Sequence, residues 1–336
     1  MFAKRRHKRL ADQTIVLTGA SSGIGLATAR AAAKAGARVF MIARNEAALA
    51  QACDEIIADG GHAAFFVADV GDRDQMTLAA TKALEVFGGF DTWVNIAGVA
   101  IYSPLCTTPR HEHERLFRTN YWGVVNGCEV ALDHLCARGG ALITVGSVVS
   151  EIGTALLGAY AASKHAVKGY IDSLRIELMG QGAPVSFSLI KPSGIGTPLA
   201  DHAANHMAGA AKVPPPSYGV QSAVDAILHC AQQPRREVVI GAAGALQILA
   251  GKITPSILDR ISTLIVPMLS DNRRPPTVAN NLFRAGAGGA VRSPHEWMQR
   301  PSAYTTASLR PLATIAAAII LSGVTLSVLR WRDRQA

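Results

Sequence analysis

Cysteines are few in this 336-residue chain, and the five that it has form no C-x-x-C pair. An odd number without that spacing argues against a disulfide framework and against a zinc ribbon. Charged residues make up only 17% of the chain and aromatic residues 6%, while the mean hydropathy is positive. The composition therefore indicates a reducing compartment and a chain that is more apolar than an ordinary soluble domain.

The net charge of +9 is concentrated at the two ends of the chain. Five basic residues lie among the first ten, and ten arginines stand against four acidic residues beyond Lys252. No aromatic and basic face of the kind that binds nucleic acid accompanies them, so an anionic membrane surface is favoured over nucleic acid. Residues 1–10 are predicted to form a basic N-terminal arm.

Short apolar runs alternate with longer amphipathic stretches between Thr14 and Ile240, which is the rhythm of a parallel sheet with connecting helices. The runs are continuously apolar, as expected for strands buried on both faces. We predict an α/β fold of the Rossmann type over residues 11–245, a doubly wound parallel seven-stranded sheet with helices on both faces. The predicted strands are Thr14–Leu17, Arg38–Ile42, Ala63–Val67, Thr92–Asn95, Ala141–Val145, Val185–Ile190 and Glu237–Ile240.

A glycine-rich turn follows the first predicted strand directly and leads into an alanine-rich helix. Its glycines permit a tight turn and let the backbone approach a pyrophosphate, whose charge then lies at the helix N-terminus. Gly19 suits the turn, Gly23 the close approach and Gly25 the packing of helix on strand. The predicted dinucleotide-binding residues of this turn are Thr18, Gly19, Ser21, Ser22, Gly23, Ile24 and Gly25.

The end of the second predicted strand indicates which dinucleotide binds. An NAD site places an acid about 20 residues after the glycines, to bind the ribose 2′-hydroxyl. This chain has Ala43-Arg44-Asn45 there. Because a guanidinium can pair with a 2′-phosphate through its planar fork, Arg44 predicts NADP(H), with NAD(H) less favoured.

Tyr160 and Lys164 stand four residues apart at the start of a helical stretch, so they share one helix face. A free phenol has a pKa near 10 and is a poor base at neutral pH. An ammonium about 4 Å away attracts a phenolate by roughly 4 kcal/mol at an effective dielectric of 20, which is about three pKa units at most. We therefore predict that Tyr160 exchanges a proton with an alcohol or ketone and that Lys164 lowers its pKa.

Two further polar residues accompany this pair. Ser147 follows the strand Ala141–Val145 and is expected at the carboxyl edge of the sheet, where such folds bind ligands and where a hydroxyl can hold a substrate oxygen. Asn120 is an amide in an otherwise aromatic and apolar part of a helical stretch that begins near Pro109, and taken alone it fits a structural role equally well.

His202 and His206 also stand four residues apart. A zinc-protease motif needs Glu directly after the first histidine, and Ala203 occupies that position, so no metal site is predicted. The two histidines are expected to line the substrate site or to face solvent.

With these residues identified, the chain resembles the short-chain dehydrogenase/reductase family over residues 11–240. The family's T-G-x-x-x-G-x-G turn is matched by Thr18–Gly25. Its catalytic tetrad is matched by Asn120, Ser147, Tyr160 and Lys164. By this resemblance the other cofactor-contacting residues are Asp69, Val70, Asn95, Ala97, Gly98, Pro192, Ser193, Gly194, Ile195 and Thr197. Two departures occur: Ile96 replaces a second asparagine, and Ser193 replaces the glycine after the proline.

The resemblance implies an NADP(H)-dependent oxidoreductase that acts on CH–OH groups. In reduction, the nicotinamide would deliver hydride to a carbonyl while Tyr160 donates the proton and Ser147 holds the carbonyl oxygen. Lys164 would also bind the nicotinamide ribose, Asn120 would hold a water that links Lys164 to solvent, and Thr197 would contact the carboxamide. The resemblance also implies a homo-oligomer.

The C-terminal part departs from the alternating pattern, and residues 246–310 are predicted to form an amphipathic or irregular extension in which the glycine-rich stretch 285–290 is a linker. Residues 312–329 contain no charge, and a helix of that length spans about 27 Å, close to the bilayer core. We predict a membrane-associated helix at 311–330, a basic tail at 331–336, and a catalytic domain in the cytoplasm. A buried dimerisation helix, an interfacial helix and a soluble cytoplasmic protein are the alternatives.

Three functions are consistent with these patterns. The favoured one is an oxidoreductase for a lipophilic alcohol or ketone, where lipophilicity is inferred only from the apolar C-terminal stretch. A 3-oxoacyl reductase is the second, although about 95 residues beyond Ile240 argue against a compact enzyme of that kind. The third is a cofactor-binding scaffold or sensor, against which all four residues of the tetrad count.

Overall fold

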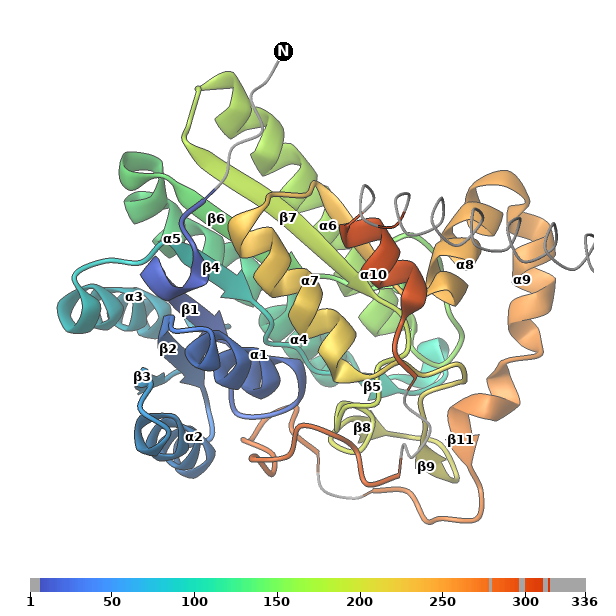
Figure 1. Cartoon of the computed structure of the whole chain (residues 1–336). Helices are drawn as coiled ribbons and strands as arrows, with labels where there is room; N and C mark the ends of the chain where they lie inside the picture. The colour runs from blue at the N-terminus through green and yellow to red at the C-terminus, as the bar shows by residue number, and fades with distance from the viewer. Residues whose placement is uncertain (1–6, 278–279, 296–299, 311–313, 315–336) are drawn as a thin grey trace, which may run out of the picture.

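The computed structural model describes residues 7–277, 280–295, 300–310 and 314 (Figure 1). Seven strands form one sheet in the order β10-β7-β6-β4-β1-β2-β3, and every neighbouring pair is parallel. The predicted seven-stranded Rossmann-type sheet is therefore confirmed, with each strand within two residues of its expected bounds. The strands are β1 (Thr14–Thr18), β2 (Arg38–Ala43), β3 (His62–Val67), β4 (Thr92–Asn95), β6 (Gly140–Val145), β7 (Val185–Pro192) and β10 (Glu237–Ile240).

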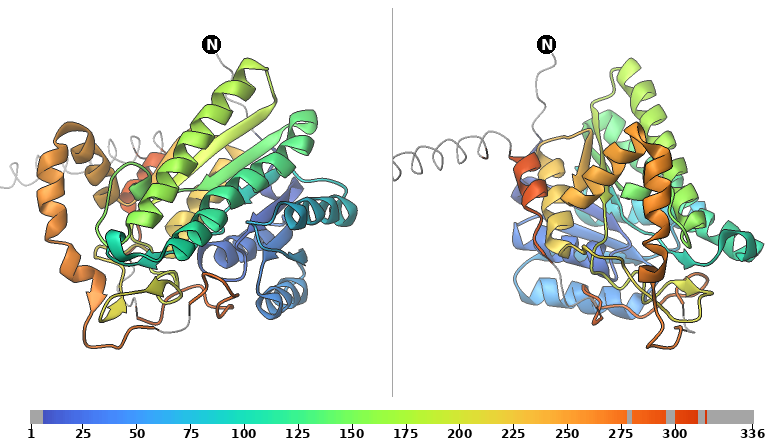
Figure 2. Two further views of the ribbon diagram at one scale, coloured as in Figure 1. Left: turned by 180° about the vertical axis from the view of Figure 1, so that it is seen from behind. Right: turned by 90° about the vertical axis from the view of Figure 1, so that its right-hand side faces the viewer.

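Helices cover both faces of this sheet (Figures 1 and 2). Successive side chains along β1 point to opposite faces, so that Ile15 and Leu17 join one buried cluster and Val16 joins the other. The first cluster is completed by α1 (Gly23–Lys34), α2 (Glu46–Ala58) and α7 (Val220–Gln232). The second is completed by α3 (Arg73–Phe87), α5 (Gly123–Arg138) and α6 (Gly158–Gly180).

The helical stretch predicted to begin near Pro109 consists of three consecutive segments. Helix α4 (Arg110–Phe117) passes through a π-helical turn, η3 (Arg118–Trp122), into α5. Such turns insert one extra residue into a helix and occur often at functional sites. Asn120 lies at the centre of this turn.

The chain beyond β10 forms helices at one side of the molecule and then returns towards the sheet (Figure 2). The hairpin of α8 (Ala242–Ile253) and α9 (Pro255–Thr263) is followed by the short strand β11 (Ser270–Asp271), a coil, and α10 (Ala303–Leu309), which packs on β10 and α7. The remaining short elements are η1 (Leu10–Asp12), β5 (Ile101–Tyr102), η2 (Leu105–Thr107), η4 (Val148–Ser150), β8 (Ala204–Asn205), β9 (Ala210–Ala211) and η5 (Val266–Leu269). Strand β11 pairs with β9, and β5 pairs with β8.

The two ends of the chain fall only partly within the described residues. In the N-terminal arm, His7 bonds to Ser186 and Lys8 forms a 2.6 Å ion pair with Asp91, so this part of the arm is held on the body. In the part of the chain that the structure describes, no helix is long and apolar enough to cross a bilayer. The prediction of a transmembrane helix and a membrane location is corrected on this finding; residues 312–329 lie, apart from Thr314, outside the described residues.

Two glycines inside helices give a test of this packing. A Cβ on Gly127 of α5 would lie 2.2 Å from Oδ1 of Asn95, whereas a Cβ on Gly169 of α6 would meet nothing within 4 Å. Gly127→Ala should therefore lower the free energy of unfolding by about 1–3 kcal/mol through overpacking. Gly169→Ala should raise it by about 0.5–1 kcal/mol because alanine favours the helix. Urea unfolding measures both, and equal effects of the two substitutions would contradict this packing.

Candidate active site

The glycine-rich turn between β1 and α1 is held in a form that only glycine permits. Gly19 and Gly23 have positive φ angles of 67° and 53°. A Cβ on Gly25 would lie 2.2 Å from the carbonyl oxygen of Gly19, and one on Gly19 would lie 2.7 Å from Cα of Ala97. The start of α1 therefore lies directly on the end of β1. The Gly23 N–H is bonded to the Ala290 carbonyl, and the absence of glycine side chains lets a pyrophosphate approach the rest of the helix N-terminus, so these residues fit a dinucleotide.

A cavity of about 350 Å³ begins at this turn and follows the carboxyl ends of the central strands. Among its lining residues are nineteen of the predicted site residues. They are Gly19, Ser21, Ser22, Gly23, Ile24, Gly25, Arg44, Asp69, Val70, Ala97, Gly98, Ser147, Tyr160, Lys164, Pro192, Ser193, Gly194, Ile195 and Thr197. Residues from seven separate parts of the sequence are thus brought to one cleft, at the sheet edge where open α/β folds bind ligands.

Three predicted site residues do not line the cavity but lie behind it. The Thr18 hydroxyl accepts hydrogen bonds from the backbone N–H groups of Ile96 (3.0 Å) and Ala97 (3.2 Å), which joins the ends of β1 and β4. The Asn95 side chain accepts a 2.9 Å bond from the indole N–H of Trp93 in the core. Both residues support the cavity wall. The third is Asn120.

The Asn120 side chain is fully buried and bonded to protein. Its oxygen accepts from the Val99 N–H at 2.8 Å, and its nitrogen donates to the Val99 carbonyl at 3.0 Å and to the Ser163 hydroxyl at 3.1 Å. The π-helical turn therefore clamps the chain after β4 to the start of α6, next to Tyr160 and Lys164. Both amide protons are used in this clamp.

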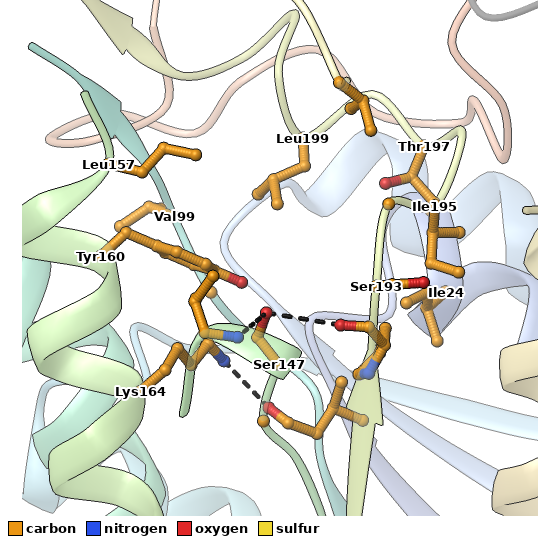
Figure 3. Close-up of a pocket in the computed structure, with 18 of the residues that line it drawn as sticks. Ile24, Val99, Ser147, Leu157, Tyr160, Lys164, Ser193, Ile195, Thr197 and Leu199 are labelled. Atoms are coloured by element: carbon orange, nitrogen blue, oxygen red, sulfur yellow. Dashed lines mark hydrogen bonds between the residues drawn. The ribbon is translucent and has the colours of Figure 1, made fainter. Parts of the chain in front are cut away.

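Tyr160, Lys164 and Ser147 converge at the middle of the cavity (Figure 3). Tyr160 and Lys164 lie one turn apart on α6, with the Lys164 Nζ 5.6 Å from the centre of the Tyr160 ring. The ammonium donates a 2.9 Å bond to the carbonyl oxygen of Val145, the last residue of β6. Ser147 follows that strand by two residues, and its hydroxyl accepts from the Val149 N–H (Figure 3).

Burial controls the proton affinities of this pair. It raises the pKa of the Tyr160 phenol to about 12, against a smaller lowering by the Ser147 hydroxyl. Burial also lowers the pKa of the Lys164 ammonium to about 8. The pKa of the Tyr160 phenol therefore lies above its ordinary value of 10, because removal from water is the larger effect, and the lowering of this pKa by Lys164 stays a prediction. Tyr160 holds its proton at neutral pH, which suits a proton donor.

At the other end of the cavity, two arginines surround Asp69. The Asp69 carboxylate accepts bonds from the backbone N–H of Gly71 (2.9 Å) and from the guanidinium of Arg115 (2.5 Å). Although burial alone would raise it, these bonds hold the pKa of Asp69 below its usual value. Arg44 also lines the cavity, and burial, partly offset by the Asp69 charge, lowers the pKa of its guanidinium. This end of the cleft therefore presents an unbalanced cation.

The two departures from the family pattern are both accommodated. The Ser193 hydroxyl donates a 2.7 Å bond to the carbonyl oxygen of Ile240 at the end of β10. A Cβ on Gly241 would lie 2.5 Å from that hydroxyl, so the glycine leaves room for the serine. Ile96 packs on the core cluster of α1 and α7, and its N–H is bonded to Thr18.

Beyond Tyr160 the cavity wall is mostly apolar. Val99, Leu157 and Leu199 surround the phenol ring (Figure 3). Other lining residues are Tyr102, Val148, Val149, Ile152, Val213, Pro214, Pro215, Pro216, Ile265 and Leu269. His202 lines the cavity, and burial lowers its pKa, whereas His206 lies 2.8 Å from the Glu112 carboxylate. The two histidines therefore do not act as a pair.

Arg115, Asn281 and Leu282 were missed by the sequence reasoning. In the sequence, Arg115 is one of several charged residues at the start of a helix. Only the fold brings Arg115 to Asp69. Asn281 lines the cavity, and the Leu282 carbonyl accepts a 2.9 Å bond from Arg115. The stretch that contains them carries no periodic signal. The glycine-rich run after it was interpreted as a linker.

Comparisons with known proteins agree with this architecture. Residues 13–208 match the family described as short chain dehydrogenase. The uncharacterized oxidoreductase YxnA of Bacillus subtilis is 39% identical over 319 residues, which are 93% of this chain and 90% of that protein. The ketoacyl reductase HetN of Nostoc is 28% identical over 75% of this chain and 88% of its own length.

Two solved structures are also similar. A metagenomic short-chain oxidoreductase in complex with NADP has a TM-score of 0.59 and 28% identity, and the match covers 69% of this chain and 97% of that one. An alcohol dehydrogenase of Thermococcus sibiricus complexed with 5-hydroxy-NADP has a TM-score of 0.61 and 23% identity, over 68% of this chain and 95% of that one. At 23% identity, the similarity to the alcohol dehydrogenase shows only that the two chains share a fold.

The buried lysine gives a stability test. Its pKa is lowered from 10.5 to about 8, so the folded protein is destabilised by the ammonium below pH 8, and this penalty disappears as the pH rises to 10.5. Lys164→Met should raise the free energy of unfolding at pH 7 by about 1–3 kcal/mol, after the lost bond to Val145 is subtracted, and by less at pH 10. The exposed control Lys82→Met should change it by less than about 0.5 kcal/mol at either pH. Urea unfolding at both pH values measures these changes. A Lys164→Met protein that is less stable than the wild type at pH 7 would show that burial does not penalise the Lys164 ammonium.

Proposed function

The chain belongs to the short-chain dehydrogenase/reductase family, and from that premise we propose that it is an NADP(H)-dependent oxidoreductase that interconverts an alcohol and a ketone or aldehyde. The observation that carries the proposal is the convergence of Tyr160, Ser147 and Lys164 on the cavity that begins at the glycine-rich turn. A protonated phenol, a hydroxyl and a buried amine at one point of a dinucleotide cleft are the groups that carbonyl reduction requires.

Each of these residues has a distinct part in the proposed reaction. NADPH, when bound, supplies the hydride for the carbonyl carbon. Tyr160 donates its phenolic proton to the carbonyl oxygen as the π bond breaks, which leaves an alcohol and a phenolate. The Ser147 hydroxyl, which donates a 3.4 Å bond to the Pro192 carbonyl in the structure, turns to donate a hydrogen bond to the same substrate oxygen and orients it. Lys164, charged at pH 7 because its pKa is about 8, stabilises the phenolate until a proton returns from solvent.

Asn120 is proposed to act by positioning. Its two amide protons are bonded to Val99 and Ser163, so it fixes the segment after β4 against the helix that carries the reacting residues. The side-chain oxygen has a second lone pair that is available to a water. The hydrogen bonds of Asn120 support this positioning role, and the binding of a water by its side-chain oxygen is proposed in addition.

The choice of NADP(H) rests on Arg44 at the end of β2. Arg44 lines the cavity next to Asp69, whose charge is already paired with Arg115. A 2′-phosphate would therefore meet a free charge partner rather than a carboxylate. The family relative solved in complex with NADP is in keeping with this choice.

The substrate is proposed to be lipophilic because of the wall around Tyr160. Val99, Leu157 and Leu199 enclose the phenol, and apolar residues from η4, η5 and the 213–216 segment extend the wall. Such a surface gains free energy by removing an alkyl chain from water, about 0.8 kcal/mol per CH₂. A 3-oxoacyl thioester also fits this wall, and the ketoacyl reductase HetN is a relative, so it is the second candidate.

Removal of one oxygen atom tests the proton donor. Tyr160→Phe should lower kcat/KM for NADPH-dependent reduction by about 10³-fold or more, since the proton donor is lost while the ring remains. Tyr304→Phe, at a partly exposed site outside the cavity, should keep full activity. NADPH oxidation against carbonyl compounds graded by chain length, including a 3-oxoacyl thioester, measures the effect. Full turnover by Tyr160→Phe would overturn the mechanism, and no turnover by the wild type across the panel would favour a scaffold.

Removal of the cation tests the cofactor choice. Arg44→Leu should raise the Kd for NADPH about 10- to 100-fold, because a charge-assisted pair with the 2′-phosphate is lost, and should change the Kd for NADH by much less. Arg73→Leu removes an exposed arginine that does not line the cavity and serves as the control. Titration calorimetry with both cofactors gives the ratio, and a wild type that prefers NADH would contradict the role of Arg44.

A further inference from the structure

Residues 281–293 cross the dinucleotide end of the cleft, and we refer to them as the strap. After β11 the chain runs along the lower side of the molecule in Figure 1, back to the neighbourhood of α1 and α2. The Gly289 N–H donates to the Ser21 carbonyl at 2.9 Å, and the Gly23 N–H donates to the Ala290 carbonyl at 2.9 Å. The strap is thus bonded on both sides to the glycine-rich turn.

Further bonds fix the strap before and after that point. Near its start, the Asn281 N–H donates to the carbonyl oxygen of His202 at 2.9 Å. At its end, the Ser293 N–H donates to the carbonyl oxygen of Gly196 at 3.1 Å. Between them, the Asn45 side chain donates to the Gly286 carbonyl at 2.8 Å. These partners belong to the regions that border the cavity, so the strap bridges its two sides.

One side chain anchors the strap in the protein. Leu282 is 1% exposed and joins the cluster of Val99, Leu116 and Ala159 beside Tyr160. Its neighbour Phe283 is 53% exposed. Leu282 is therefore the most deeply buried apolar contact of the strap, while Val291 packs on the first core cluster and the strap carbonyls are bonded by backbone and side-chain donors.

The strap also holds the cation of the cofactor site. The Arg44 guanidinium donates to the carbonyl oxygens of Asn281 and Leu282, and Arg115 donates to the Leu282 carbonyl as well. A guanidinium has five N–H donors, so those not bonded to the strap remain available to a phosphate. The two carbonyl groups thereby limit the directions in which Arg44 can point.

Asn281 has in addition an unused acceptor. Its Oδ1 is buried and accepts no hydrogen bond from the residues that the structure describes, and Asn281 lines the same cavity as Arg44 and Asp69. A buried acceptor left without a partner costs about 1–3 kcal/mol, so a ligand that supplies a donor there binds with that gain. An ionised phosphate has only acceptors. The donor must therefore be a hydroxyl or an amino group, and the adenosine half of a dinucleotide carries both.

We propose that the strap forms the outer wall of the dinucleotide site and that Asn281 is a cofactor-binding residue, whose side-chain oxygen accepts a hydrogen bond from the adenosine half of the cofactor while its backbone carbonyl orients Arg44. The inference rests on the dinucleotide-binding part of the proposed function. In this arrangement the adenosine end is enclosed by residues 237 and 238 positions from Arg44 in the sequence, and release of the cofactor requires the strap to lift.

Binding measurements on the full chain separate the two parts of this inference. Asn281→Leu keeps the shape and the backbone carbonyl but removes the acceptor, and it should raise the Kd for NADPH and for NADH alike by about tenfold. Arg44→Leu removes the partner of the 2′-phosphate and should raise the Kd for NADPH much more than the Kd for NADH, so the two patterns differ. Leu282→Ala releases the apolar anchor and should speed NADPH dissociation at least tenfold in stopped-flow fluorescence. Phe283→Ala, exposed and next to the anchor, should leave the Kd and the dissociation rate at wild-type values.

The nature of the donor follows from one analogue. Deamino-NADPH lacks the adenine amino group but keeps the ribose hydroxyl. If Asn281→Leu weakens the binding of deamino-NADPH as much as that of NADPH, the ribose hydroxyl is the donor. If the wild type already binds deamino-NADPH tenfold more weakly than NADPH, and Asn281→Leu does not weaken this binding further, the amino group is the donor. If the Asn281→Leu protein binds NADPH with the same Kd as the wild type, the proposed contact between Asn281 and the cofactor is wrong.

Hydrogen exchange on the wild type tests the strap without any substitution. NADPH should slow exchange of the Gly289 and Ser293 amides at least tenfold, because the cofactor holds the strap down. If saturation with NADPH leaves the exchange rates of these two amides unchanged, the strap does not form the outer wall of the cofactor site. None of these measurements needs turnover, so a protein that binds NADPH through Asn281 but reduces no carbonyl would refute the proposed catalysis and leave this inference standing.

Discussion

The burial of the Lys164 amine at the carboxyl edge of the sheet is the constraint on which the site depends. The amine is 3% exposed and bonded to the last carbonyl of β6, and burial lowers its pKa to about 8. A cation in that position is tolerated only if an electron-rich group is within reach, and Tyr160 lies one helical turn away. The bond between Lys164 and Val145 joins the end of β6 to α6, the helix that carries Tyr160. Burial raises the pKa of the phenol to about 12, and the amine with its pKa of about 8 is charged at pH 7, a combination that suits proton donation.

The chain beyond β10 encloses the cleft at both ends. Gln247 of α8, Ser262 of α9 and Leu269 of η5 line one end of the cavity, and the strap borders the other end at the glycine-rich turn. The family match ends at residue 208, whereas the similarity to YxnA covers 93% of this chain. The extension is therefore shared with that relative and is part of the cleft, not an appendage to it.

Much of this arrangement could be predicted from the sequence, because its causes are local. Strands buried on both faces are continuous apolar runs, and the close contact of Gly25 with Gly19 leaves a fixed glycine spacing. The role of Asn281 could not be predicted, since its contact with Arg44 joins residues 237 positions apart and uses a backbone carbonyl that any residue has. The glycine-rich run 285–290 was interpreted as a linker because composition indicates conformational freedom and not what the backbone touches. The rise of the Tyr160 pKa could not be predicted for a related reason: the i, i+4 spacing brings the two groups together but does not show how much water each of them loses.

The central claim is that Tyr160 holds a proton that Lys164 and the bound cofactor make available. Titration of tyrosine labelled with ¹³C at Cζ, with the Tyr160 signal assigned by its loss in Tyr160→Phe, measures this directly. Without cofactor the signal should stay that of a phenol through pH 9 and titrate near pH 12. With NADP⁺, whose positive charge favours the phenolate, the pKa should fall by more than about one unit. A phenol already ionised at pH 7 in the free protein, or one with the same pKa in both states, would contradict the account.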